Sequence, residues 1–258
     1  MQRNTTTRLV VALAAVGLTL AACGSDDKAA DTTKAPASTA AAPAGSASQE
    51  YCDAAMAINT AAAGTGDPDA DPVAFATQLI GPAKTAAAVA PTELAGDYTT
   101  AINAMQAAID GDSSKLPELD AAAPKIDDFN AASCPWTKVP VTMEDFHFTG
   151  LPESLAAGDY TFALDNKGKD VHVLVIVKKK AGVTESFDEL LADPAAESKV
   201  DTVVGGGAGP GEQANAFGHL EPGEYLALCP ISQGSAGTTE GTGPPHFTLG
   251  MSQLINVR

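Results

Sequence analysis

Basic residues are scarce in this chain: Lys and Arg together number 15, against 32 Asp and Glu, and the formal net charge is -17 at pH 7. Proteins that bind nucleic acids neutralise phosphates with Lys and Arg, so this balance argues against a nucleic-acid partner. An acidic surface favours solubility and cationic partners instead. Hydrophobic residues make up 45% of the 258 residues, which excludes a wholly disordered chain and allows one large domain or two small ones.

The sequence also lacks the short motifs of common hydrolases. It contains no G-x-S-x-G nucleophile elbow and no H-E-x-x-H zinc motif. The glycine-rich run at residues 205–210 has neither the Lys nor the Ser/Thr of a phosphate-binding loop, and we interpret it as a plain loop. We therefore expect a protein that is not an enzyme.

An apolar stretch near the N-terminus, residues 9–20, follows two arginines and is too short to span a bilayer. This arrangement is typical of a signal peptide. The stretch ends Leu20-Ala21-Ala22-Cys23-Gly24, which resembles the lipobox of bacterial lipoproteins, where the cysteine is lipidated after cleavage. The resemblance implies a signal peptide over residues 1–22 and acyl chains on Cys23 that hold the protein on the extracytoplasmic face of the cell membrane. The alternative is an ordinary secretory signal with an incidental cysteine.

Large apolar side chains are missing from the segment that follows. Residues 24–49 contain none larger than alanine. Such a segment buries too little surface to offset its chain entropy. We therefore expect residues 23–49 to form a flexible tether between the lipid anchor and the folded chain.

A helical pattern occupies residues 50–135. Five apolar residues recur at intervals of three or four and share one helix face: Leu94, Tyr98, Ile102, Met105 and Ile109. Asp71 followed by Pro72 predicts a helix start, and Pro91 predicts the start of the next helix. Pro82 predicts a break between them. We expect a small α-helical bundle of about four alanine-rich helices.

Cysteines are few, and their positions are informative. If Cys23 carries lipid, then Cys52, Cys134 and Cys229 remain in an oxidising compartment. A disulfide between Cys52 and Cys134 would join the two ends of the helical region and contribute about 4 kcal/mol. Cys229 would then be unpaired, which favours a role as a metal ligand. Two alternatives remain: Cys229 pairs with one of the other two, or it is a small buried residue.

Beyond residue 139 the apolar pattern becomes that of β-strands. Residues 171–177 form a continuous apolar run typical of a strand covered on both faces, and shorter strands are expected at 224–229 and 252–257. Ser186 and Glu189 have the spacing of a capping box and predict a short helix over 184–193. Many short strands separated by Pro and Gly turns predict an antiparallel Greek-key β-sandwich over residues 139–258.

Four potential metal ligands accompany these strands. His172 lies at the start of the 171–177 run, Cys229 ends the strand at 224–229, and His246 and Met251 precede the last strand. A thiolate, two imidazoles and a more distant thioether form a ligand set that suits copper. In the alternative interpretation, His172 is a core histidine and Met251 fills the core. His147 and His219 are interpreted as outward-facing or structural residues that become ligands only if the chain displaces His246.

The order of these motifs resembles the cupredoxin, or blue-copper, family. The motifs are an N-x-G turn from Asn166 before the strand that carries His172, a PGxYxxxC run that ends at Cys229, and an H-x4-M run from His246 to Met251. The resemblance implies a copper site formed by His172, Cys229, His246 and Met251, which serves electron transfer or copper handling with a redox or copper-delivery partner. An alternative is a metal-free cupredoxin-like sandwich that acts as a cell-envelope interaction module.

The segment between Cys229 and His246 is longer than is usual in cupredoxins. Sixteen residues, 230–245, lie between the two, and they are rich in Gly, Ser and Thr. We expect them to bulge out as a flap. Pro244 and Pro245 would stiffen the returning segment and direct His246 to the metal site.

Overall fold

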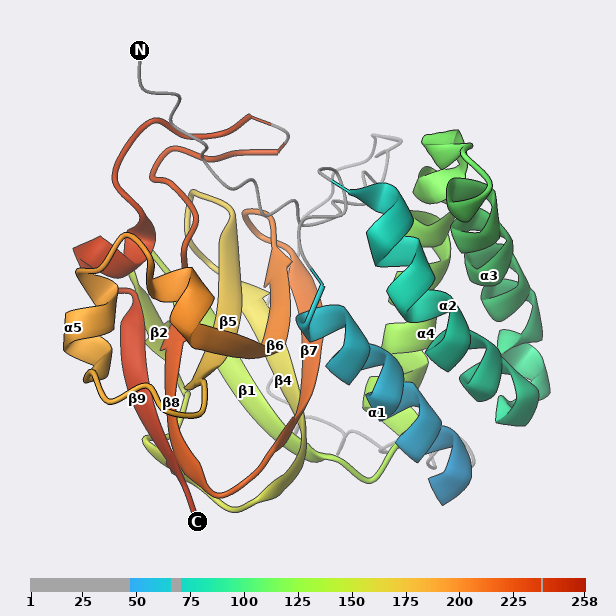
Figure 1. The fold of residues 1–258 in the computed structure, drawn as a ribbon, viewed down its shortest axis with the longest axis horizontal. Helices are drawn as coiled ribbons and strands as arrows, with labels where there is room; N and C mark the ends of the chain where they lie inside the picture. The colour runs from blue at the N-terminus through green and yellow to red at the C-terminus, as the bar shows by residue number, and fades with distance from the viewer. Residues whose placement is uncertain (1–46, 66–70, 238) are drawn as a thin grey trace, which may run out of the picture.

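The structure, a computed structural model, describes residues 47–65, 71–237 and 239–258. In this part of the chain a bundle of helices is followed by a two-sheet β-sandwich that lies beside it (Figure 1). The predicted fold class, a helical bundle followed by a β-sandwich, is confirmed. The signal peptide predicted over residues 1–22, the lipidation of Cys23 and the predicted tether up to residue 46 lie outside the described residues.

Four alanine-rich helices form the bundle: α1 (Gln49–Ala63), α2 (Pro72–Val89), α3 (Ala95–Ile109) and α4 (Leu116–Ser133). Short 3-10 turns at Thr92–Leu94 and Ser113–Lys115 lead into α3 and α4. A disulfide between Cys52 and Cys134 joins the first helix to the end of the last. Within the described ranges, no helix has both the length and the apolar character needed to cross a bilayer.

The predicted break at Pro82 is wrong, because α2 continues through that residue. A proline inside a helix removes the hydrogen bond to the carbonyl four residues earlier, here that of Gln78. Gln78 lies on the exposed face of α2, where water can replace the lost donor. Packing of the buried face, which includes Leu79 and Ala83, then keeps the helix continuous.

Within the described residues, the sandwich contains nine strands in two sheets. The first sheet has the order β2-β1-β4-β7, with bounds β2 (His147–Thr149), β1 (Thr137–Glu144), β4 (Gly158–Asn166) and β7 (Gln213–Leu220). The second has the order β3-β9-β8-β5-β6, with bounds β3 (Ser154–Leu155), β9 (Ser252–Val257), β8 (Gly223–Leu228), β5 (His172–Lys179) and β6 (Val200–Ala208). The antiparallel prediction needs correction, because β1 pairs with β4 and β3 pairs with β9 in parallel.

The predicted glycine-rich loop at residues 205–210 is also wrong in part, since Gly205, Gly206 and Gly207 belong to β6. At this position β6 approaches β7 of the other sheet. A Cβ on Gly206 would lie 2.7 Å from the Cβ of Ala216, which is too close for two carbon atoms. Gly206 therefore allows two sheet edges to meet where a side chain would keep them apart.

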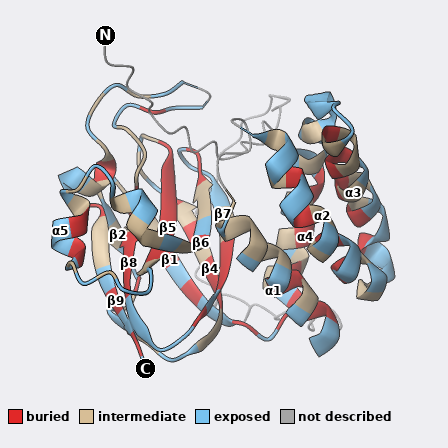
Figure 2. Ribbon diagram, viewed as in Figure 1, coloured by how far each residue is buried: buried red, intermediate tan, exposed pale blue. Residues whose placement is uncertain are grey.

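Buried residues line the space between the two sheets (Figure 2). The strand β5 lies between β8 and β6 in the second sheet, and its first six residues are buried, as the continuous apolar run predicts. The short helix α5 (Phe187–Leu191) begins with the predicted capping box and adds Phe187 and Leu190 to the core. This core fixes β5 and β8, which lead directly to the candidate metal ligands.

The bundle and the sandwich share an apolar contact. The rings of Trp136 and Phe217 meet edge to face with centroids 5.2 Å apart, and both rings belong to the apolar cluster of α1. The side chain of Asn215 on β7 donates a hydrogen bond to Asp128 of α4 at 3.3 Å. The two units therefore pack against each other along β7.

Candidate metal centre

Three of the four predicted ligands meet at one end of the sandwich. His172 is the first residue of β5, Cys229 directly follows β8, and His246 begins a 3-10 turn, His246–Leu249. One ligand atom from each of the three lies within 4.8 Å of the others, and all three side chains are completely buried. Among the described residues, this is the one group of three or more His, Cys, Asp or Glu side chains with such spacing.

A buried asparagine shapes the turn that presents His172. The Asn166 side chain accepts a hydrogen bond from the Gly168 amide at 2.8 Å and donates to the carbonyls of Asp170 and Ala208 at 2.9 and 2.8 Å. These bonds fold the chain from the end of β4 to the start of β5. The N-x-G motif thus places His172 by a local side-chain-to-backbone turn.

Backbone hydrogen bonds hold the other ligands in register. The Cys229 amide donates to the Met251 carbonyl at 3.1 Å, and the Met251 amide donates to the His246 carbonyl at 3.1 Å. Gly250, directly before Met251, has φ of +112°, a conformation that favours glycine. Met251 is completely buried, and these backbone hydrogen bonds place it next to Cys229 and His246.

The two imidazoles face each other through their Nδ1 atoms, which are 3.1 Å apart. The sulfur of Cys229 lies 3.4 Å from Nδ1 of His246 and accepts a hydrogen bond from the Val173 amide at 3.4 Å. Each imidazole directs its Nε2 atom to a carboxylate: Asp145 lies 2.9 Å from His172, and Asp170 lies 3.2 Å from His246. An ionised carboxylate only accepts, so these contacts assign the proton of each neutral ring to Nε2.

That assignment leaves two unprotonated Nδ1 atoms and a sulfur directed at one another. Burial and the neighbouring His172 lower the pKa of His246, so a second proton on this ring is disfavoured. Burial also raises the pKa of the Cys229 thiol to about 11. A metal cation that displaces the thiol proton would be coordinated by all three atoms, and the residues present therefore fit a metal ion.

Sequence reasoning missed the two carboxylates. Asp145 comes from the turn after β1, and Asp170 lies two residues before His172. The hydrogen bonds of Asp145 from His172 and the Lys169 amide outweigh its partial burial and lower the pKa of its carboxyl. Asp170 could have been suggested by its distance of two residues from His172, whereas Asp145 is brought to the site only by tertiary folding.

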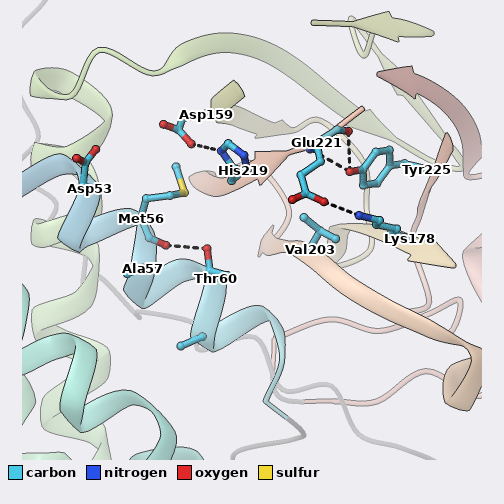
Figure 3. Close-up of a pocket in the computed structure, with 11 residues that line it drawn as sticks. Asp53, Met56, Ala57, Thr60, Asp159, Lys178, Val203, His219, Glu221 and Tyr225 are labelled. Atoms are coloured by element: carbon cyan, nitrogen blue, oxygen red, sulfur yellow. Dashed lines mark hydrogen bonds and ion pairs between the residues drawn. The ribbon is translucent and has the colours of Figure 1, made fainter. Parts of the chain in front are cut away.

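The remaining histidines lie away from the cluster. His147 and His219 are exposed and pair with Glu144 at 2.9 Å and Asp159 at 2.6 Å. His219 and Asp159 border a cleft between α1 and the sandwich, together with Met56 of α1 (Figure 3). None of the three clustered ligands lines this cleft.

The described parts of the segment 230–245, residues 230–237 and 239–245, project from the end of the sandwich (Figure 1). Its base is attached to the chain that precedes His172: the Gly234 amide donates to Asp170 at 2.6 Å, and the Val171 amide donates to the Ser235 carbonyl at 2.8 Å. Ser232 pairs with Pro245 in an isolated bridge. The expected flap therefore has a fixed base beside the two imidazoles.

No protein-family model matches this chain, and no curated protein matches it. Solved structures that match part of it include two blue-copper or related proteins. Auracyanin A of Chloroflexus aurantiacus, a "blue" copper protein, is 20% identical over 47% of this chain and 98% of its own, with a TM-score of 0.31. Reduced auracyanin from Roseiflexus castenholzii is 21% identical over 47% and 97%, with a TM-score of 0.31.

Enzymes are also among the similar structures. The Cu-containing nitrite reductase of Thermus scotoductus SA-01 is 11% identical over 47% of this chain and 31% of its own, with a TM-score of 0.28. At these scores the case for a metal centre rests on the geometry of the chain's own residues.

Proposed function

We propose that this chain binds one copper ion through His172, Cys229 and His246, with Met251 as a weak fourth ligand, and that it transfers electrons. The observation that supports the proposal is the convergence of two imidazoles and one sulfur, with one ligand atom of each within 4.8 Å of the others, in a fully buried site. Copper bound there would supply a one-electron Cu(II)/Cu(I) couple.

The donor set favours copper over other metals. Zinc is held by Cys, His, Asp and Glu, and thioethers are not among its usual protein ligands. A thiolate with two imidazoles and a thioether is the set found in copper electron-transfer sites. The backbone bonds from Met251 to Cys229 and His246 support its place in the set.

Electron transfer is favoured over catalysis and over copper delivery. The ligands have no exposed surface, and no ligand borders the cleft of Figure 3, so a substrate has no evident approach to the cluster. An electron needs no such approach. The fixed base of segment 230–245 and the hydrogen-bonded imidazoles support a preorganised site, which suits a metal that stays bound.

The cellular setting is part of the same proposal. The signal-like N-terminus and the lipobox ending at Cys23 support attachment to the outer face of a bacterial cell membrane by acyl chains. The disulfide between Cys52 and Cys134 fits an oxidising compartment. The partner would then be a redox protein at the membrane surface.

Metal stoichiometry tests this proposal. The purified chain is loaded with Cu(II), Cu(I) or Zn(II), and the bound metal per chain is measured after gel filtration. We expect one copper per wild-type chain, loss of copper in His246→Ala, and full copper in His147→Ala, a matched histidine that is exposed. Equal copper retention by both variants, or no copper in the wild type, would contradict the proposal and favour a metal-free interaction module.

A further inference from the structure

We propose that Asp145 and Asp170 are positioning residues that fix the two imidazoles for coordination and bias the bound copper towards the divalent state. This inference rests on the proposed function. Groups that form hydrogen bonds with the metal ligands set the orientation of those ligands and tune the bound metal in many metal sites.

Asp145 is held in place independently of any metal. Its Oδ1 atom lies 2.9 Å from Nε2 of His172, and both carboxylate oxygens accept from the Lys169 amide, at 3.0 and 3.3 Å. The aromatic ring of Phe146, the next residue, packs against His172 and His246 with centroids 6.5 and 4.8 Å away. The turn after β1 therefore supplies both a carboxylate for one imidazole and a cover for both.

Gly168 makes the contact between Asp145 and His172 possible. A Cβ at this position would overlap both the Oδ1 atom of Asp145 and the Nε2 atom of His172. The glycine thus leaves just enough space for a direct hydrogen bond. The backbone conformation alone does not require a glycine here, because φ at Gly168 lies outside the left-handed range.

Asp170 performs the same task for the second imidazole. Its Oδ2 atom lies 3.2 Å from Nε2 of His246 and accepts from the Gly234 amide at 2.6 Å. One oxygen therefore contacts both the ligand and the base of segment 230–245. With 15% of its side chain exposed, Asp170 is largely screened from water.

The negative charge of these two carboxylates favours Cu(II) over Cu(I). Each lies one imidazole away from the point where the ligand atoms converge. The side chain of Asp170 is 15% exposed and that of Asp145 is 27% exposed, so water screens both charges less than it would at a fully exposed site. Cu(II) has one more positive charge than Cu(I), so two nearby negative charges stabilise Cu(II) more. The centre should therefore have a lower reduction potential than the same ligands with neutral partners.

Substitution by asparagine separates charge from hydrogen bonding, because the amide oxygen can still accept from Nε2. Cu(II) and Cu(I) affinities are measured by competition for the wild type, Asp145→Asn and Asp170→Asn. The matched control is Asp159→Asn. Asp159 also accepts a hydrogen bond from an imidazole, that of His219 (Figure 3), but it lies at the opposite end of β4 from Asn166.

We expect each site variant to lower the ratio of Cu(II) to Cu(I) affinity about tenfold, which is a rise of about 59 mV in the one-electron potential. The control should keep the wild-type ratio. An unchanged ratio in both site variants, or an equal fall in the control, would overturn the inference while leaving copper binding established. A wild type without copper would overturn the proposed function as well.

The imidazole tautomers give a second readout that needs no metal. Nitrogen-15 NMR of the copper-free wild type should show unprotonated Nδ1 and protonated Nε2 in His172 and His246. Asp145→Ala should redistribute the proton in His172 and leave His246 unchanged, and Asp170→Ala should do the converse. Protonated Nδ1 atoms in the wild type, or spectra that are unaffected in both variants, would refute the positioning role.

Discussion

Nδ1 of His172 lies 3.1 Å from Nδ1 of His246, although 74 residues separate them in the sequence. Both rings direct Nε2 to a carboxylate, so the proton of each neutral ring is on Nε2. The two Nδ1 atoms therefore face each other with their electron pairs and without a proton between them. The Cys229 sulfur completes the group at 3.4 Å from His246. The relationship follows from the positions of β5 and of the turn before β9.

Gly168→Ala should weaken copper binding by about 10- to 100-fold, the usual effect of disturbing a hydrogen-bond partner of a ligand. The new methyl group would push Asp145 and His172 apart. Competition titrations with a copper chelator measure the change. Gly205→Ala is the matched control, since a Cβ there meets no atom within 4 Å; an equal loss in the control would refute the steric explanation.

Removal of the disulfide should destabilise the chain without affecting the metal centre. The bridge joins residues 82 positions apart, and in the chain-entropy model such a loop contributes about 4 kcal/mol. The variant with Cys52→Ala and Cys134→Ala together should therefore unfold at lower denaturant concentration and bind copper as before. Unchanged unfolding, or loss of copper binding from the folded variant, would contradict this assignment.

The bundle should become less stable as pH rises towards about 7. Burial, and secondarily the charge of Asp128, raise the pKa of Asp127 to about 7. The carboxyl is thus neutral in the folded chain at pH 5, whereas in the unfolded chain it ionises at its ordinary, lower pKa, so stability is lost as pH rises towards about 7. Asp127→Asn should remove this loss, with a gain over wild type that is on the order of 1–2 kcal/mol larger at pH 8 than at pH 5.

Chemical denaturation at the two pH values measures the effect. Asp110→Asn, at the exposed end of α3, provides a control with the same change of side chain. A gain for Asp127→Asn that is the same at pH 5 and pH 8 would show that the carboxyl does not titrate in this range.

Local sequence patterns predicted the elements that depend on local chemistry. The last strand was expected at residues 252–257 and is found at Ser252–Val257, because its alternating pattern and flanking turn are complete in the sequence. The capping box at Ser186 and the disulfide between Cys52 and Cys134 are likewise present. Cys229 is free and buried, which removes the alternative in which it pairs with another cysteine.

Features that depend on distant contacts could not be predicted in this way. The continuity of α2 through Pro82 depends on which helix face is buried, and the strand at Gly205 depends on pairing with Val175 of β5. Asp145 reaches His172 only because β1 pairs in parallel with β4 and its last turn lies beside the start of β5. The sequence carries no spacing rule for such a contact.

The most direct test of the account is the visible spectrum of the copper-loaded chain during stepwise reduction. We predict an intense thiolate-to-Cu(II) band that one electron per chain removes and reoxidation restores, and that is absent in Cys229→Ser. A copper-loaded chain without this band, or a band that persists in Cys229→Ser, would contradict a redox-active copper centre at His172, Cys229 and His246.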